Sequence, residues 1–307
     1  MLQKFSEAVF EWQAGQPTYD QVMLPRETTQ VYEIVPDDQP NHDLVGRPIA
    51  HLSGFKQATG EAEFLGDRPL FVNELCGAVV MSTRAHAKII TINYDAALAM
   101  KGVVRIFDAK SLEPGRNNFV LLFSKDELVF AEDEVNFYGQ PIAFVVAETQ
   151  EIAQEAAHAV QVEYENKLPL ILNIDDAIKE KSFYNDKMHI SSGNIKEGFE
   201  GSQSVLDGEF LVGAQKHFAL EPNGSIAIPK EDNEIEIIAT IQAPKNVQSI
   251  VCQCLGLRSN EVIVKTKRVG GGFGGKETRP CFLSVCTALA ALKYAATSSN
   301  VNYRFLC

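Results

Sequence analysis

The stretch that decides the fold of the second half of this chain is VGGGFGGKETR, which runs from Val269 to Arg279. Five of the six residues from 270 to 275 are glycine, the sixth is Phe273, and a Lys-Glu pair follows directly. Consecutive glycines let a backbone turn sharply and approach another group closely. What this loop holds is therefore the first question about function. Three answers compete: a dinucleotide, a nucleoside triphosphate, and another kind of ligand.

The sequence on either side places this loop between a strand and a helix. Before it, EVIVKTKRV (261–269) alternates apolar and polar residues, which predicts a β-strand. After it, Pro280 suits the first turn of a helix, and CFLSVCTALAALKY (281–294) is apolar on nearly all sides, which predicts a buried helix. A glycine-rich turn between a strand and a helix is also the context of nucleotide-binding loops.

Neither nucleotide motif is complete in this loop. Gly270, Gly272 and Gly275 match the G-x-G-x-x-G fingerprint, but that fingerprint expects an acidic residue about 20 positions later to hold a ribose. No Asp or Glu follows Glu277. In the triphosphate motif a hydroxyl that ligates magnesium follows the lysine, whereas here Glu277 follows Lys276. The residues therefore disfavour both nucleotides.

The remaining interpretation is a planar ligand. The glycines would bring backbone N–H groups toward it, and the helix beyond would add positive potential. The ring of Phe273 would suit a planar face, and Glu277 could accept a hydrogen bond from a heterocycle N–H. The structural alternative, which the residues leave open, is a tight turn with Phe273 packed into the core.

Two residues upstream of the loop raise similar choices. His217 has no Cys or carboxylate partner at a metal-ligand spacing, so we interpret it as a packing histidine rather than a metal ligand. Glu221, directly before Pro222, either supports a site or ends a strand. No residue of the chain is thus predicted to ligate a metal directly.

Composition excludes several classes of function. The 28 basic and 40 acidic residues give a formal net charge of -12, which argues against nucleic-acid binding. No apolar run approaches the roughly 20 residues that span a bilayer, and the acidic start MLQKFSEAVFEWQ does not resemble a secretory signal. The cysteines form no CxxC pair, so we expect reduced thiols that mostly fill the core of a cytoplasmic protein. They are Cys76, Cys252, Cys254, Cys281, Cys286 and Cys307.

The sequence pattern predicts a linker over 1–43, an α/β module over 44–178, and a second boundary within 179–201 that is followed by a further region of strands and helices. In the module we expect strands within 76–95, 102–109 and 141–148, and a helix that begins after Thr149 and runs into another strand. In the last region we expect a strand over SVLDGEFLVGAQKHFA (204–219), a strand over 234–242, and a helix from 245 closed by Gly256.

Several motifs, in this order, resemble the molybdenum hydroxylase family of xanthine dehydrogenases and aldehyde oxidases, and its xanthine dehydrogenase branch most closely. They are VGRPIAHLSGFKQATGEAEF (45–64), TRAHAKI (83–89), GQPIAFVVAET (139–149), GAQKHFALEP (213–222) and the glycine loop. The resemblance implies an α+β fold class: an α/β hammerhead domain over 44–178, followed by an incomplete mixed α/β molybdopterin-binding domain over 190–307.

The same resemblance implies roles for four residues. Gln215 would lie beside the molybdenum centre, and Phe273 with its neighbour Gly274 would line the molybdopterin cofactor. Glu277 would contact a purine substrate, and it favours a purine oxidoreductase because aldehyde oxidases generally lack a glutamate after the GGK. The family's general base and its substrate-binding arginine have no counterpart in this sequence, so no catalytic residue is assigned.

In this family, water supplies the oxygen that hydroxylates purines such as hypoxanthine and xanthine, and electrons pass through 2Fe-2S clusters to FAD. The resemblance implies that those groups lie in remaining domains of a full-length, homodimeric enzyme. The chain is then expected to be a fragment, an incomplete gene model or a degenerate copy, inactive alone and holding part of a molybdenum-molybdopterin site. The alternatives are a non-catalytic hammerhead module for binding or assembly, and an aldehyde oxidase-like fragment.

Overall fold

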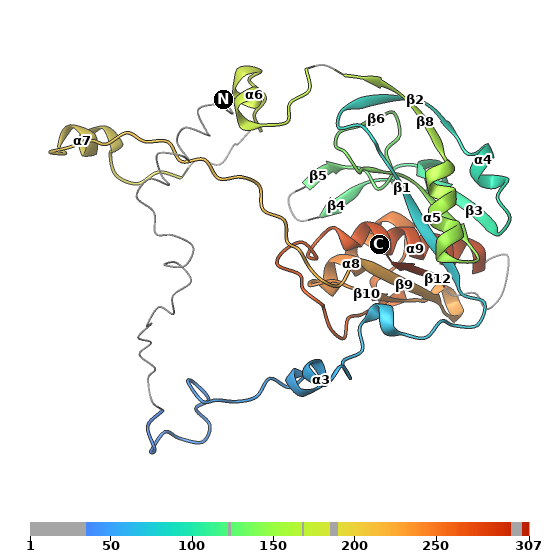
Figure 1. Cartoon of the computed structure of the whole chain (residues 1–307), viewed down its shortest axis with the longest axis horizontal. Helices are drawn as coiled ribbons and strands as arrows, with labels where there is room; N and C mark the ends of the chain where they lie inside the picture. Colours follow the sequence, from blue (N-terminus) through green and yellow to red (C-terminus); the bar gives the residue numbers. More distant parts are fainter. Residues whose placement is uncertain (1–34, 122–123, 168, 185–189, 296–302, 307) are drawn as a thin grey trace, which may run out of the picture. The chain divides into compact units, whose positions relative to one another are not determined.

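The computed structural model of the chain describes residues 35–121, 124–167, 169–184, 190–295 and 303–306 (Figure 1). It divides into two compact units, Met1–Ala62 and Glu63–Cys307. In the first unit, the helix α3 (Gly54–Thr59) ends at Gly60, whose φ of 78° is the left-handed conformation that glycine adopts without strain. The predicted linker over 1–43 lies mostly outside the described residues.

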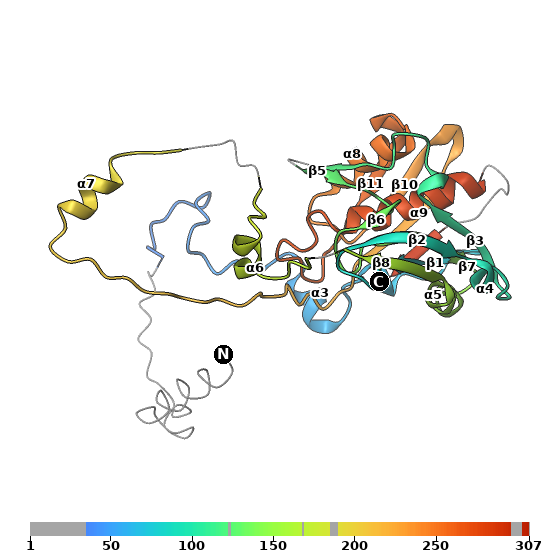
Figure 2. The same ribbon diagram turned by 90° about the horizontal axis from the view of Figure 1, so that it is seen from above.

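The second unit is built on a seven-stranded mixed sheet, seen from two directions in Figures 1 and 2. Its strands, in spatial order, are β11 (Val262–Lys265), β10 (Ile235–Ala239), β9 (Gly224–Pro229), β12 (Tyr303–Leu306), β1 (Leu75–Met81), β7 (Pro141–Ala147) and β3 (Val103–Asp108). The first half of the unit thus supplies three adjacent strands and the second half supplies four. One sheet therefore joins the two halves.

Strand β7 shows why its apolar sequence forms an interior strand. It pairs antiparallel with β1 and with β3, so both its edges are satisfied, and six of its seven residues are buried. Phe144 and Val146 belong to the larger core, whereas Ala143 and Val145 belong to a second core. Because successive side chains point to opposite faces, an uninterrupted apolar run is what such a strand requires. The strand predicted within 141–148 is confirmed.

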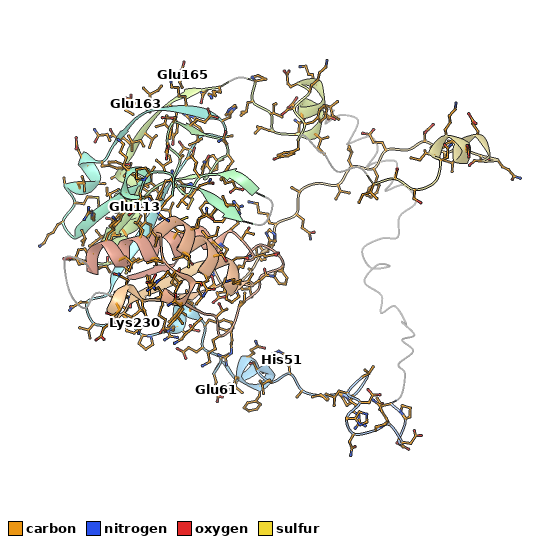
Figure 3. All side chains as sticks on the ribbon, turned by 180° about the vertical axis from the view of Figure 1, so that it is seen from behind. His51, Glu61, Glu113, Glu163, Glu165 and Lys230 are labelled. Carbon is orange, nitrogen blue, oxygen red and sulfur yellow. The ribbon has the colours of Figure 1, made fainter. Side chains whose placement is uncertain are left out.

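Two smaller sheets and the first long helix accompany this layer. A three-stranded sheet contains β6 (Glu134–Val135), β2 (Ala87–Asn93) and β8 (Gln161–Asn166), and a hairpin contains β4 (Phe119–Leu121) and β5 (Ser124–Glu127). The helix α5 (Gln150–Ala159) begins where Thr149 Oγ1 accepts a hydrogen bond from the Ile152 amide at 3.3 Å, as predicted. On β8, the exposed Glu163 and Glu165 (Figure 3) alternate with partly buried residues.

The second half contributes two long helices to the larger core. The helix α8 (Pro244–Leu255) ends at Gly256 with φ 71°, and α9 (Pro280–Ala295) packs on α8 and β9. Both were predicted. Short elements complete the described chain: α4 (Asp95–Leu98), α6 (Ile174–Lys179), α7 (Ile195–Glu200) and 3-10 turns at Leu65–Asp67, Ala109–Ser111, Glu231–Asn233 and Ser259–Glu261. Within the described ranges, no helix has the length and apolarity that a membrane crossing needs.

The cysteines that the structure describes are free thiols, as expected. Four of these are buried and Cys252 is partly buried. Burial raises the pKa of Cys254 and of Cys281 to about 12, so both thiols stay protonated and act as core filler. Cys307 lies outside the described residues.

One predicted strand is wrong and another is shorter than predicted. Residues 202–219 contain no regular secondary structure, although SVLDGEFLVGAQKHFA has strand-like composition. A strand needs a hydrogen-bonded neighbour, and none of the described strands pairs with this segment. Strand β11 stops at Lys265, four residues before the end of the predicted strand, because the chain there leaves β10 and turns toward the glycine loop.

Candidate cofactor and substrate site

The glycine loop after β11 is packed against other parts of this same chain. At Gly270, Gly272 and Gly275 an added Cβ would lie closer than 3.0 Å to a neighbouring side chain, and at Gly271 it would be crowded while the φ of 95° also favours glycine. Such a Cβ would lie 2.4 Å from Glu221 Cβ at Gly270, 3.2 Å from Ala219 Cα at Gly271, 2.5 Å from Gln242 Oε1 at Gly272 and 2.7 Å from His217 Cγ at Gly275. We expected the glycines to let the backbone approach a ligand, but these four let it approach protein instead.

A buried ion pair fixes the two ends of the loop to each other. Lys276 Nζ lies 3.0 Å from Glu221 Oε2, and the two side chains are only 3% and 9% exposed. The same carboxylate oxygen accepts a hydrogen bond from the Gly270 amide at 2.6 Å, and the Glu221 amide donates to the Gly270 carbonyl at 3.0 Å. Of the two roles left open for Glu221, support of the loop is therefore the one that its contacts show.

Gln242 holds the far side of the loop, and the sequence analysis missed it. Its side-chain Oε1 accepts hydrogen bonds from the backbone amides of Gly274 (3.0 Å) and Lys276 (3.2 Å). The backbone amide of Gln242 donates to the Lys276 carbonyl at 2.8 Å. The available signal was a lone glutamine soon after the buried strand β10. Without the fold, nothing in the sequence indicates that this strand ends beside the loop.

Some backbone amides of the loop donate hydrogen bonds within the protein, and others do not. Those of residues 270 and 274–277 donate to acceptors within the protein. Among the described residues, no acceptor binds the amides of Gly271, Gly272 and Phe273. The expectation that the loop turns N–H groups toward a ligand is thus restricted to this short run at its tip.

Phe273 stands at the tip of the loop, exposed and in an unusual conformation. Its side chain is 72% exposed and its φ is 53°, in the left-handed region that a residue with a Cβ rarely adopts. The structural alternative, in which Phe273 packs into the core, is therefore wrong. The next residue, Gly274, also has a positive φ of 87°, and a Cβ there would meet no described atom within 4 Å.

An open hollow of about 520 Å³ brings Phe273 together with Gln215, and Lys216 and His217 complete its lining. The imidazole of His217 packs on Gly275, which agrees with its interpretation as a packing residue. Within the described ranges, no three His, Cys, Asp or Glu side chains gather as metal ligands. The hollow thus offers an aromatic face, an amide and a cation beside the vacant space at Gly274, a set that fits a large planar, polar group.

Glu277 is held by its backbone and leaves its carboxylate open. Its amide donates to the Gly274 carbonyl at 3.2 Å, and its carbonyl accepts from Asn246 Nδ2 at 3.2 Å. Its side chain is exposed, and no described residue bonds the carboxylate. It does not line the hollow that contains Phe273. The structure therefore brings Gln215 and Phe273 together in one hollow, with Gly274 next to Phe273 in the chain, and Glu277 lies outside the hollow on the same loop.

Two family models match the chain in succession. Residues 59–168 match the aldehyde oxidase and xanthine dehydrogenase a/b hammerhead domain, and residues 176–304 match the molybdopterin cofactor-binding domain. The described fold thus consists of a hammerhead domain followed by a domain of the molybdopterin cofactor-binding type, and the glycine loop lies in the second.

The similar proteins identify the family. The chain is 43% identical to the xanthine dehydrogenase/oxidase of Rattus norvegicus over 301 residues, which are 95% of the chain and 22% of the rat protein. It is 43% identical to aldehyde oxidase 2 of Cavia porcellus over 273 residues, which are 89% of the chain and 20% of that protein. The chain belongs to the xanthine dehydrogenase/aldehyde oxidase family of molybdenum-containing oxidoreductases, and it spans about a fifth of the length of these relatives.

Solved structures of related enzymes share the fold. The reconstituted CO dehydrogenase from Oligotropha carboxidovorans aligns with a TM-score of 0.71 and 25% identity over 84% of this chain and 34% of that one. Quinoline 2-oxidoreductase from Pseudomonas putida 86 aligns with a TM-score of 0.71 and 22% identity over 84% of this chain and 34% of that one, a likeness of fold alone. The α+β fold class that the resemblance implied, a hammerhead domain followed by a mixed α/β molybdopterin-binding domain, is confirmed.

Proposed function

We propose that this chain forms part of the molybdopterin site and the substrate wall of an enzyme that hydroxylates purines. The observation that carries the proposal is Phe273: an exposed aromatic ring, held in a left-handed conformation by a loop that Glu221 and Lys276 fix from beneath. A strained backbone with an exposed apolar side chain is costly without a ligand to contact. When bound, the molybdenum-molybdopterin group supplies the redox chemistry that no side chain can.

The residues of the hollow act by binding and orienting. Phe273 offers a flat apolar face, and the Gln215 amide can both donate and accept a hydrogen bond. Gly274 leaves room for a group close to the backbone, and the free amides at 271–273 point to an acceptor on that group. These functions need no reaction step from the chain itself, in agreement with its lack of an assigned catalytic residue.

Glu277 is the residue proposed to select a purine. An open carboxylate can accept hydrogen bonds from ring N–H groups, and so favours one orientation of the heterocycle. The runner-up function, oxidation of aldehydes, is favoured by the equal identity to aldehyde oxidase 2 of Cavia porcellus, 43%. The two proposals differ in what they require of Glu277, because an aldehyde has no ring N–H to donate.

The test is Glu277→Val in the molybdenum enzyme that carries this sequence. We expect kcat/KM for xanthine to fall by about 10-fold to 100-fold, the size of one or two hydrogen bonds to a charged group. Turnover of a simple aldehyde should change little. Glu277→Gln, which keeps an acceptor, serves as the control and should retain part of the purine activity. Equal losses for xanthine and the aldehyde would overturn the assignment.

The wider assembly is inferred from the family. We infer that 2Fe-2S clusters and FAD lie in other domains, that those domains and a second copy of the enzyme are the partners of this chain, and that the enzyme works in the cytoplasm. The similarity to about a fifth of each larger relative supports further domains. Cofactor analysis and gel filtration of the complete enzyme would test these inferences.

A further inference from the structure

The hairpin β4–β5 belongs to the range that matches the hammerhead model, yet it packs on the helices of the cofactor-binding range. Phe119 in β4 is 1% exposed, and its ring stacks on that of Phe282 in α9 with centroids 4.0 Å apart and planes 6° from parallel. Next to it, Gln253 in α8 donates through Nε2 to the Asn118 carbonyl at 2.8 Å. The start of the hairpin is therefore anchored across the boundary between the two ranges.

Arg279, the last residue of the VGGGFGGKETR loop, binds the second strand of this hairpin. Its Nη1 and Nη2 donate to the two carboxylate oxygens of Glu127 at 2.8 and 3.1 Å. Its Cζ also lies over the rings of Phe119 and Phe282, at 5.7 and 5.2 Å from their centroids. Because Phe119 pairs with Glu127 across the hairpin, one antiparallel pair supplies both the ring and the carboxylate.

The planar fork of an arginine makes this contact directional. A bidentate pair fixes the plane of the guanidinium, and the ring faces fix its position above them. The side chains of Arg279 and Glu127 are 48% and 27% exposed, so the pair contributes little to global stability. What it sets is geometry: the exit of the loop is held at a defined place against the hammerhead domain.

Glu277 lies two residues before Arg279 and depends on this exit. Toward its N-terminal side the loop is fixed by Gln242 and by the buried Lys276. Toward its C-terminal side, the Cys281 amide donates to the Thr278 carbonyl at 3.0 Å, in a turn that begins α9. The backbone that carries the open carboxylate of Glu277 is thus held on one side by residues of the cofactor-binding domain. On the other side it is held by the contact between Arg279 and the hairpin.

We propose that Glu127, in the hammerhead domain, is a positioning residue for Glu277 and acts through the Arg279 guanidinium. The hammerhead domain then adjusts the substrate side of the site without touching substrate. The role assigned to Glu277 rests on the proposed function. The Glu127–Arg279 latch itself rests only on the contacts above, so the two can fail separately.

The latch is tested by hydrogen–deuterium exchange on the full 307-residue chain with Glu127→Gln. We expect the amides of residues 277–282 other than Pro280 to exchange about threefold to fivefold faster, the size expected when one partly exposed bidentate ion pair is lost. The matched control is Glu134→Gln, which removes the ion pair with Lys167 in the three-stranded sheet and should leave 277–282 unchanged. Unchanged exchange in Glu127→Gln would overturn the latch.

A second variant separates geometry from charge. Arg279→Lys keeps a cation but loses the fork and the flat face, so it should speed exchange at 277–282 as Glu127→Gln does. Protection equal to that of the wild type would contradict a geometric role.

The positioning role is measured in the complete molybdenum enzyme. Glu127→Gln should raise KM for xanthine by about threefold to fivefold, leave KM for a simple aldehyde unchanged, and leave molybdenum content unchanged. Faster exchange with an unchanged xanthine KM would overturn the positioning of Glu277 while the latch stands. Equal rises in KM for both substrates would likewise overturn it, since the effect would then not pass through a purine contact.

Discussion

Two segments line the same hollow, but only one of them is shaped by the rest of the chain. The loop at 270–277 is held by a buried ion pair, by Gln242 and by four glycines in close contact with protein. The segment at 202–218, which carries Gln215, is exposed throughout and has no regular secondary structure. Contacts within this chain thus fix the position of Phe273, whereas the placement of Gln215 lacks such support.

The segment at 202–218 presents an apolar face to solvent. Leu206, Phe210 and Val212 are 96%, 90% and 80% exposed, and they occur at alternate or fourth positions that share one face of an extended strand. An apolar face of this kind is stabilised by a neighbouring strand or layer. In the loop, by contrast, burial of Lys276 and Glu221 supplies the stabilising contacts locally. Substitutions in the two segments test this difference.

The largest effect is expected from Glu221→Gln, which removes one partner of the buried ion pair. Lys276 would stay almost fully buried without a counter-charge, so we expect the free energy of unfolding to fall by about 3–5 kcal/mol in urea denaturation. The double variant Glu221→Leu/Lys276→Met removes both charges and should recover most of the loss. A loss below about 1 kcal/mol in the single variant would show that the pair does not hold the loop.

A smaller effect of opposite sign is expected from Phe273→Gly. Glycine adopts a φ of 53° without strain, and the exposed ring contributes little burial, so the free energy of unfolding should rise by about 0.5–1 kcal/mol. In the complete enzyme the same change should lower the molybdenum retained after gel filtration. Phe210→Gly is the control, because Phe210 is 90% exposed and has no positive φ, and it should produce neither change. Lower stability in Phe273→Gly would contradict the strain argument.

The smallest effect on stability is expected from Gln215→Ala. Its side chain is exposed, so unfolding should change by no more than about 0.5 kcal/mol, as measured by thermal or urea denaturation. Molybdenum retention in the complete enzyme should nevertheless fall. A destabilisation similar to that of Glu221→Gln would show that the segment is held as firmly as the loop, and would remove the contrast between them.

Local patterns predicted the elements around the site well. The caps at Thr149 and Gly256, the buried strand β7 and the helix α9 are set by residues close together in sequence, so their patterns suffice. The same holds for the position of the glycine loop between a strand and a helix. The resemblance to the family predicted the fold class, which hydrophobic periodicity alone does not indicate.

The contacts that build the site were not predictable from the sequence. Lys276 and Glu221 are 55 positions apart, and Gln242 reaches Gly274 across 32 positions. A run of glycines indicates that something approaches the backbone closely, but not whether it is a ligand or the protein, and here four of five approach the protein. The strand predicted over 204–219 failed for a related reason, because composition cannot supply a pairing partner.

The place of β12 in the sheet bears on how the protein is handled in the laboratory. This strand runs parallel to β1 on one side and antiparallel to β9 on the other, so it is interior to the sheet. A shortened version of the protein that stops before Tyr303 would lack this strand and uncover the facing edges of β1 and β9, which are templates for aggregation. Any shortened version prepared in the laboratory should therefore retain Tyr303–Leu306.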